Sequence, residues 1–150
     1  ELCQRWQLEI DGSVMNGYTG LAIPVRRDKE ACILKVYWRD EDTDSAPLAL
    51  QIWNGRGAVK LLAHEPSLGA MLLERLDPTS SLEVVEISEA IVIAGRLLRR
   101  LAIPAPAQMR SVTALAASMA QTMPSKSGLV TIRTRTSKIK SLTRLLIIKP

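Results

Sequence analysis

A single lysine inside an apolar, β-branched run is the feature that most constrains this chain. Residues 31–37 read Ala-Cys-Ile-Leu-Lys-Val-Tyr, a composition typical of a buried strand. An ammonium group has no packing reason to lie in such a strand. Lys35 therefore points either to the solvent face of a half-buried strand, as period-two alternation commonly arranges, or into a cleft where an anion meets it.

The composition is that of a single domain with a hydrophobic core. The chain has 150 residues, of which 47% are hydrophobic, and this suits one ordinary domain. No apolar run reaches the roughly 18–20 residues that span a bilayer, and the acidic start is not that of a signal peptide, so we expect a soluble, cytoplasmic protein. Two cysteines without C-x-x-C spacing and one histidine predict neither a disulfide framework nor a zinc site.

The net charge of +5 is concentrated near the carboxyl end. Residues 125–150 contain no acid and seven basic residues, namely Lys126, Arg133, Arg135, Lys138, Lys140, Arg144 and Lys149. Subtracting those seven from +5 leaves −2 for the rest of the chain. Aromatic residues make up 3%, so the basic side chains are not interleaved with the stacking platforms of single-strand binders. A basic arm for nucleic acid is therefore the least favoured interpretation.

The first half of the chain predicts short strands around one helix. The segments with strand character are 5–10, 18–26, 31–37, 58–63 and 70–76. Turn signals such as Asp11-Gly12 and the charged residues 27–30 separate the early strands, which makes antiparallel pairing the economical topology. The acidic residues 39–45 suit a helix start, and this helix would run through Trp53 and end at Asn54-Gly55.

Beyond the fifth strand the spacing of apolar residues changes. Residues 83–101 carry them at three- and four-residue intervals, which predicts an amphipathic helix that Ser80 or Ser81 would cap. After a proline-punctuated break, residues 109–122 predict a second, alanine-rich helix. Residues 124–150 are rich in serine, threonine and basic residues and carry no clear pattern.

This order of elements is that of a protein-kinase-like N-lobe, a five-stranded antiparallel sheet with one inserted helix. We expect an α+β fold in which residues 1–78 form a nucleotide-binding lobe. Residues 79–123 would be the first helices of an incomplete C-lobe, and residues 124–150 a basic tail. In kinase-type sites a lysine on the third strand faces the nucleotide phosphates, whose oxygens its charge offsets. Lys35 occupies that place.

Several distinctive sequence stretches lie between residues 5 and 106. They are RWQLEIDG (5–12), GYTGLAIPVRR (17–27), ILKVYW (33–38), LALQIWNGRGAVKLLAHEP (48–66), GAMLLERLDP (69–78) and LLRRLAIPAP (97–106). These stretches resemble the family of aminoglycoside 6-phosphotransferases (streptomycin kinases) and hydroxyurea-resistance kinases. The resemblance implies ATP-dependent phosphorylation of an antibiotic hydroxyl, with ATP and Mg²⁺ as cofactors and an aminoglycoside-type small molecule as partner.

The resemblance implies nucleotide contacts at four positions. Lys35 would contact the α- and β-phosphates of ATP. Gly17 would lie in the loop over the phosphates, although an ordinary hairpin turn explains this glycine equally well. Glu74 and Leu76 would offer main-chain groups to adenine at the connection between the lobes, and the alternative for Glu74 is a solvated strand end.

One partner of the lysine is missing from its expected place. In the family, the helix after the lysine strand carries a glutamate that pairs with the lysine, and Ala46 stands at the matching position. A neutral methyl group cannot orient Lys35. Either one of the preceding acids, Glu41, Asp42 or Asp44, takes this role after a shifted helix start, or the lysine is unpaired.

The carboxylates needed for phosphoryl transfer are also missing. Such transfer uses an acidic residue to take the hydroxyl proton and others to hold magnesium, yet no acidic residue follows Glu89. Arg56 suits a turn position better than the alternative role of a ligand, and His64 suits a turn position in which no role as a base is supported. Since the basic tail shows no continuation of the family pattern, we expect a truncated phosphotransferase that is inactive alone. The alternative is a non-catalytic nucleotide-binding or interaction fragment.

Overall fold

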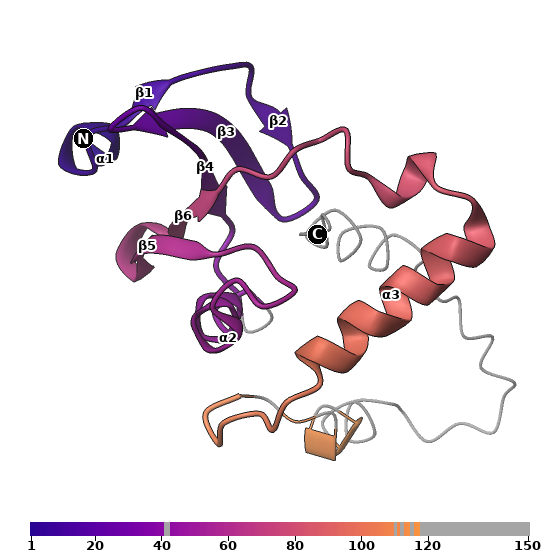
Figure 1. Ribbon diagram of the computed structural model, residues 1–150. Helices are drawn as coiled ribbons and strands as arrows, with labels where there is room; N and C mark the ends of the chain where they lie inside the picture. The colour runs from indigo at the N-terminus through magenta and orange to yellow at the C-terminus, as the bar shows by residue number, and fades with distance from the viewer. Residues whose placement is uncertain (41–42, 110, 112, 115, 118–150) are drawn as a thin grey trace, which may run out of the picture.

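The structure, a computed structural model, describes residues 1–40, 43–109, 111, 113–114 and 116–117. Its sheet contains β1 (Glu9–Ile10), β2 (Met15–Asn16), β3 (Gly20–Arg27), β4 (Glu30–Tyr37), β5 (Leu61–Glu65) and β6 (Ala70–Glu74). The strand order is β1-β3-β4-β6-β5, with β2 paired to β3 beside that path. All pairings are antiparallel. The strand that carries Lys35, β4, is therefore central (Figure 1).

The helices are α1 (Leu2–Arg5), α2 (Ala46–Trp53) and α3 (Ile87–Leu101), with 3₁₀ turns η1 (Pro66–Leu68) and η2 (Leu82–Val84). Helix α2 follows a turn in which the main-chain N–H groups of Asp40 and Thr43 each donate to the other residue's side chain, at 2.9 and 2.7 Å. It ends at Asn54, whose φ of 45° is left-handed. The predicted helix between the lysine strand and the next strand is thus confirmed.

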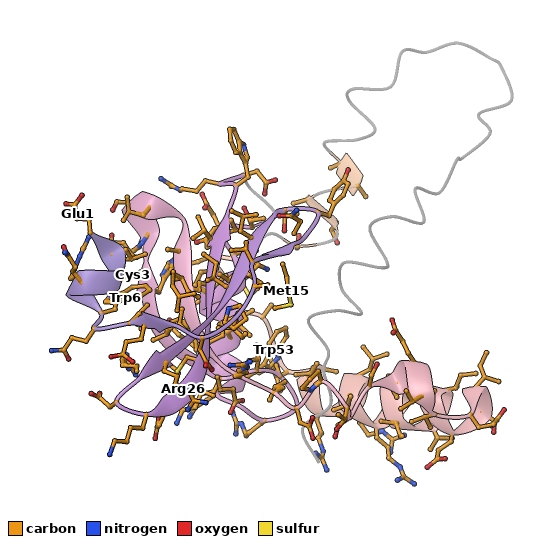
Figure 2. The ribbon with its side chains drawn as sticks, turned by 90° about the horizontal axis from the view of Figure 1, so that it is seen from above. Glu1, Cys3, Trp6, Met15, Arg26 and Trp53 are labelled. Carbon is orange, nitrogen blue, oxygen red and sulfur yellow. The ribbon has the colours of Figure 1, made fainter. Side chains whose placement is uncertain are left out.

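The central strand separates two apolar clusters. On one face Cys32 and Leu34 pack with Leu72, and the segment around α1 covers them. On the other face Tyr37 packs with Met71 and with residues of α2. Figure 2 shows Trp6 beside α1 and Trp53, the last residue of α2, on the side of the sheet where α3 ends. Alternation along β4 places the side chain of Lys35, two residues before Tyr37, on the α2 face.

Helix α3 contacts the rest of the described chain through its last turn. The indole Nε1 of Trp53 donates to the carbonyl oxygen of Leu101 at 3.1 Å. A β-carbon on Gly57, whose φ is +89°, would lie 3.6 Å from the side chains of Leu97 and Leu101. The loop after α2 therefore packs closely against the end of α3, while the rest of this helix extends away from the sheet (Figure 1).

The predicted first strand was wrong over most of its length. Residues 5–8 are the end of α1 and a turn, and only Glu9–Ile10 pair with β3. The main-chain N–H of Trp6 donates to the carbonyl oxygen of Leu2 at 3.0 Å, and Gln7 adopts a φ of 54°. The chain turns there so that Leu8 enters the core. The two-residue strand β2 was not predicted.

Two other boundaries differ from the prediction. The fourth predicted strand, 58–63, is observed as β5 at Leu61–Glu65. Ala58 and Val59 lie in the loop before it, because they pack in the apolar cluster beside α2. The pairing of β5 with β6 is irregular between Leu61 and Ala63. The predicted helix 83–101 begins later, at Ile87. The hydroxyl of Ser81 accepts from the main chain of Glu83 and so begins η2, not α3.

The remaining predictions concern the carboxyl-terminal third. Most of the predicted helix 109–122 and all of the segment 124–150 lie outside the described residues. Within the described part, no helix has the length and apolar character needed to cross a membrane.

Candidate functional site

Lys35 lies in the middle of the sheet, on the face that α2 covers. Its strand partners are Ala22 on β3 and Met71 on β6. The β3 neighbour of the lysine thus carries only a methyl group, whereas Met71 on its other side is fully buried. The sequence offered a solvent-facing lysine as one alternative, and the half-buried Lys35 on the α2 face is not that case.

The electrostatic surroundings of Lys35 are unusual for a lysine. Burial lowers the pKa of its ammonium group below the ordinary value. Among the described residues, no side chain or carbonyl oxygen forms an ion pair or hydrogen bond with this ammonium. A partly desolvated cation that has no counter-ion among the described side chains is a favourable place for an anionic ligand.

The structure shows what became of the candidate partners of Lys35. Ala46 is the first residue of α2, so the neutral position predicted from the sequence lies at the start of this helix. Asp44 forms an ion pair with Arg39 at 3.4 Å, and it does not replace the missing glutamate. Glu41 and Asp42 lie outside the described residues.

The loop between β2 and β3 is a tight hairpin turn. The main-chain N–H of Gly17 donates to the carbonyl oxygen of Gly20 at 2.8 Å, so Gly17 lies in the hairpin turn between β2 and β3. A β-carbon on Gly20 would lie 2.1 Å from the carbonyl oxygen of Val36. Gly20 therefore permits the close pairing of β3 with β4 beside the lysine. The sequence signal for this role was a glycine at the edge of a strand pattern.

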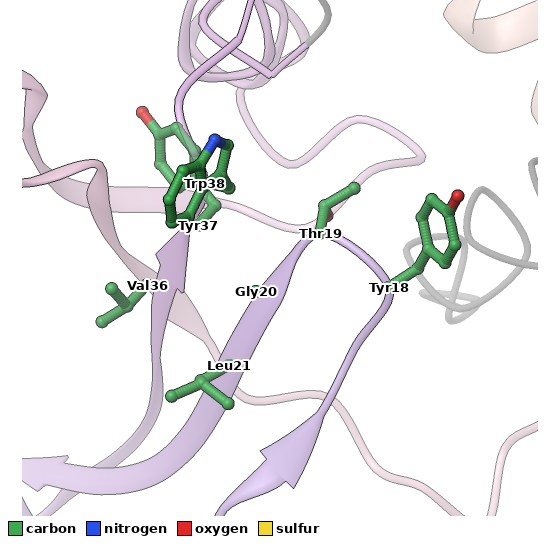
Figure 3. A pocket seen from close by; sticks show the side chains of 7 residues that line it. All are labelled: Tyr18, Thr19, Gly20, Leu21, Val36, Tyr37 and Trp38. Carbon is green, nitrogen blue, oxygen red and sulfur yellow. The ribbon is translucent and has the colours of Figure 1, made fainter.

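A hollow of about 440 Å³ lies at the same end of the hairpin. It is lined by Tyr18, Thr19, Gly20, Leu21, Val36, Tyr37 and Trp38 (Figure 3). Leu21 and Val36 are paired residues on the face opposite Lys35. The hollow does not include Lys35, and it is distinct from the surroundings of the ammonium group.

The predicted adenine contacts lie where β6 ends. The main-chain N–H of Glu74 donates to the carbonyl oxygen of Lys60 at 3.0 Å, and its carboxylate accepts from the N–H of Lys60 at 2.8 Å. Glu74 is the last residue of β6, and its carboxylate holds the approach to β5. The side chain of Leu76 packs against the α2-side cluster, and its main-chain N–H has no hydrogen-bond partner in the described structure.

A charged cluster that the sequence did not indicate lies beside this connection. The carboxylate of Asp11 accepts from Nη1 of Arg75 at 2.6 Å and lies 3.2 Å from Nε of Arg26. The hydrogen bond from Arg75 is the main reason why the pKa of Asp11 is below its usual value. The paired residues Asp11 and Arg75 are 64 positions apart, and no local pattern announces such a contact.

Arg56 and His64 take structural places. The guanidinium of Arg56 donates to the carbonyl oxygens of Ile52 and Trp53, at 3.2 and 3.3 Å, and completes the end of α2. His64 lies in β5 and not in a turn, which corrects that prediction. Its Nε2 is 3.0 Å from the hydroxyl of Tyr37, and burial lowers the pKa of its imidazole.

Magnesium would need a different set of side chains. Among the described residues, no three histidine, cysteine or acidic side chains converge to hold a metal ion. The ammonium of Lys35 and the free N–H of Leu76 fit an anionic nucleotide, but nothing in the described part fits its metal.

The chain is similar to curated proteins that are named as streptomycin kinases and a hydroxyurea phosphotransferase. Streptomycin 6-kinase from Streptomyces glaucescens is 40% identical over 127 residues, which are 83% of this chain and 41% of that protein. Streptomycin 6-kinase from Streptomyces griseus is 39% identical over 124 residues, 81% of this chain and 40% of that protein. Hydroxyurea phosphotransferase from Kitasatospora aureofaciens is 36% identical over 133 residues, 85% and 39% of the two chains.

The match to a family is broader than the sequence phrases suggested. The chain spans about two fifths of the length of these curated relatives. Residues 5–133 match the family described as aminoglycoside/hydroxyurea antibiotic resistance kinase. The match includes residues 124–133, which belong to the segment that was expected to show no continuation of the family pattern. The chain belongs to the aminoglycoside/hydroxyurea antibiotic resistance kinase family.

Proposed function

We propose that the sheet and α2 form the nucleotide-binding lobe of an antibiotic phosphotransferase and that this lobe binds ATP. The observation that carries the proposal is the ammonium of Lys35, half-buried on the central strand and without a described counter-ion. The α- and β-phosphates of ATP would supply the missing negative charge. Phosphate binding by a point charge of this kind is the usual task of the equivalent kinase lysine.

Adenine would be bound by the main chain that follows β6. Leu76 has a free N–H group that can donate to a ring nitrogen, and we expect the carbonyl oxygen of Glu74 to accept from the exocyclic amino group. Gly17, in the hairpin turn, would lie over the phosphates. Residues 79–123 would be the first helices of the second lobe.

The acceptor would be a hydroxyl group of a small antibiotic. The relatives are named for streptomycin and hydroxyurea, and the reaction would be in-line transfer of the γ-phosphoryl group. Residues 90–150 contain no carboxylate to act as a base or to hold magnesium. We therefore expect no phosphorylation of streptomycin or hydroxyurea by this chain alone, and turnover in a direct assay would contradict this expectation.

Calorimetry with ATP tests the proposal. We expect measurable binding by the chain and at least a tenfold weaker affinity for Lys35→Ala, because a charge-assisted phosphate contact is worth about 1.5–3 kcal/mol. Lys60→Ala is the matched control, since Lys60 is an exposed lysine just before β5 and its hydrogen bonds with Glu74 use main-chain groups that alanine keeps. Equal affinities for the three proteins, or no binding by a chain whose circular dichroism shows it folded, would contradict the proposal.

A non-catalytic interaction fragment is the second candidate. Ile87, Ile91 and Leu98 recur on one side of α3 and are 60–73% exposed. An apolar stripe of this kind promotes association. This candidate predicts self-association that Ile91→Asp abolishes, together with no ATP binding. Light scattering beside the calorimetry distinguishes it from the nucleotide-binding lobe.

A further inference from the structure

We propose that Asp11 is a positioning residue for the adenine-binding connection, which it fixes by holding Arg75. This inference rests on the proposed function, because it concerns the main chain between Glu74 and Leu76. Arg75 stands between those two residues, and its guanidinium donates to the Asp11 carboxylate at 2.6 Å.

Asp11 is itself firmly anchored. Its main-chain N–H donates to the carbonyl oxygen of Pro24 on β3 at 2.8 Å. Arg26 lies 3.2 Å from the same carboxylate oxygen, and this arginine also donates to the carbonyl oxygen of Lys29 at 3.1 Å. The carboxylate therefore projects from the β1–β3 edge of the sheet in a fixed direction, toward Arg75.

The connection is held from the opposite edge as well. Glu74 exchanges two hydrogen bonds with Lys60, which leads into β5. In the strand order, β5 and β1 are the two outer strands and β6 lies beside β5. Arg75 thus links the connection to the far side of the sheet, while Glu74 links it to the near side. Between them they set the direction in which the free N–H of Leu76 points.

We call the ion pair of Asp11 with Arg75 the clamp. We expect it to preorganise the connection after β6 and to contribute little to the stability of the fold. Ion pairs between half-exposed side chains contribute little to stability, and Asp11 and Arg75 are each about one-third exposed. A main chain that is already oriented, however, loses less entropy when a ligand binds. Loss of the clamp should weaken binding of the adenine ring and leave binding of the phosphates by Lys35 unaffected.

Comparing ATP with inorganic tripolyphosphate tests this inference by calorimetry. We expect Asp11→Asn and Arg75→Gln each to weaken ATP binding roughly three- to tenfold and to leave tripolyphosphate affinity unchanged. The double variant should be no weaker than either single variant, since both remove one interaction. Asp28→Asn is the matched control, because Asp28 is an exposed acid with no ion pair among the described residues.

The outcomes separate the inference from the proposed function. Unchanged ATP affinity in Asp11→Asn overturns the inference alone. An equal loss for ATP and tripolyphosphate, with a lowered melting temperature, also overturns it, since that result indicates a merely structural ion pair. If the unaltered chain binds neither ligand, the proposed function fails. A selective loss of ATP affinity in both single variants, absent in Asp28→Asn, supports the inference.

Discussion

The indole Nε1 of Trp53 donates to the carbonyl oxygen of Leu101 at 3.1 Å and joins the last turn of α2 to the end of α3. Trp53→Phe keeps an aromatic ring but removes the donor, and it leaves the carbonyl at a partly buried helix end. We expect the free energy of unfolding to fall by about 1 kcal/mol. Urea denaturation followed by circular dichroism measures this change.

Trp38→Phe is the control for that experiment. The Trp38 side chain is 80% exposed, so its replacement should alter the free energy of unfolding by less than about 0.5 kcal/mol. If Trp53→Phe and Trp38→Phe change the free energy of unfolding equally, the hydrogen bond from Trp53 to Leu101 does not stabilise the packing of α2 against α3.

Gly20 is predicted to be intolerant of any side chain. A β-carbon there would lie 2.1 Å from the carbonyl oxygen of Val36 and 2.7 Å from Cα of Tyr37. Because both atoms belong to the main chain of β4, they cannot move aside cheaply. We expect Gly20→Ala to lower the free energy of unfolding by about 1–3 kcal/mol and to weaken ATP binding.

The opposite result is expected at Gly95 on α3. Apart from the backbone of the helix itself, no atom of the described residues comes within 4 Å of the place where a β-carbon would lie. Alanine is favoured over glycine inside a helix by about 0.8–1.0 kcal/mol. Gly95→Ala should therefore raise the melting temperature. A similar response of the two variants would contradict the close approach of β3 to β4.

Stability should depend on pH through His64, the single histidine of the chain. Burial lowers the pKa of His64 below its ordinary 6.5 in the folded chain. Below pH 6.5 the unfolded chain therefore binds a proton that the folded chain does not. The stabilisation is complete above pH 6.5 and declines as the pH falls from 6.5 toward the lowered pKa.

Urea denaturation at about pH 7.5 and about pH 5.5, on either side of the ordinary histidine pKa, measures this dependence. His64→Gln keeps a polar group near the Tyr37 hydroxyl, which lies 3.0 Å from the imidazole, but it cannot titrate. We expect the difference between the two pH values to shrink in this variant. An undiminished difference would assign the pH dependence to carboxylates instead.

Lys35 should reduce stability while it serves binding. Its pKa is lowered by burial, so the charged form is disfavoured in the fold at neutral pH. Lys35→Met has a similar length without the charge, and we expect a melting temperature about 2–4 °C higher together with lost ATP affinity. Lys60→Met should change neither. A lower melting temperature for Lys35→Met would reveal a stabilising partner for the ammonium.

The sequence predicted the elements that have strong local signals. The β-branched run around Lys35 became the central strand, and Asn54-Gly55 ended α2 as expected. The strand expected at residues 5–10 failed because alternation over six residues also fits a short helix followed by a turn. The left-handed Gln7 that makes this turn has no sequence signature.

The candidate site could be predicted from the sequence only in the part that lies on one strand. Lys35 stood out because its neighbours on the strand are apolar. The clamp of Asp11 on Arg75 depends on the pairing of distant strands, and the free N–H of Leu76 depends on where β6 ends. Such relations arise from tertiary packing and were beyond the reach of local pattern.

The central claim is that ATP phosphates meet Lys35, and affinity labelling tests it most directly. An ATP analogue with an electrophilic acyl phosphate transfers its acyl group to a lysine near the bound phosphates, and mass spectrometry identifies the modified residue. We predict modification of Lys35 that excess ATP prevents. Modification spread over exposed lysines such as Lys29 and Lys60, with Lys35 unlabelled and no protection by ATP, would contradict the account.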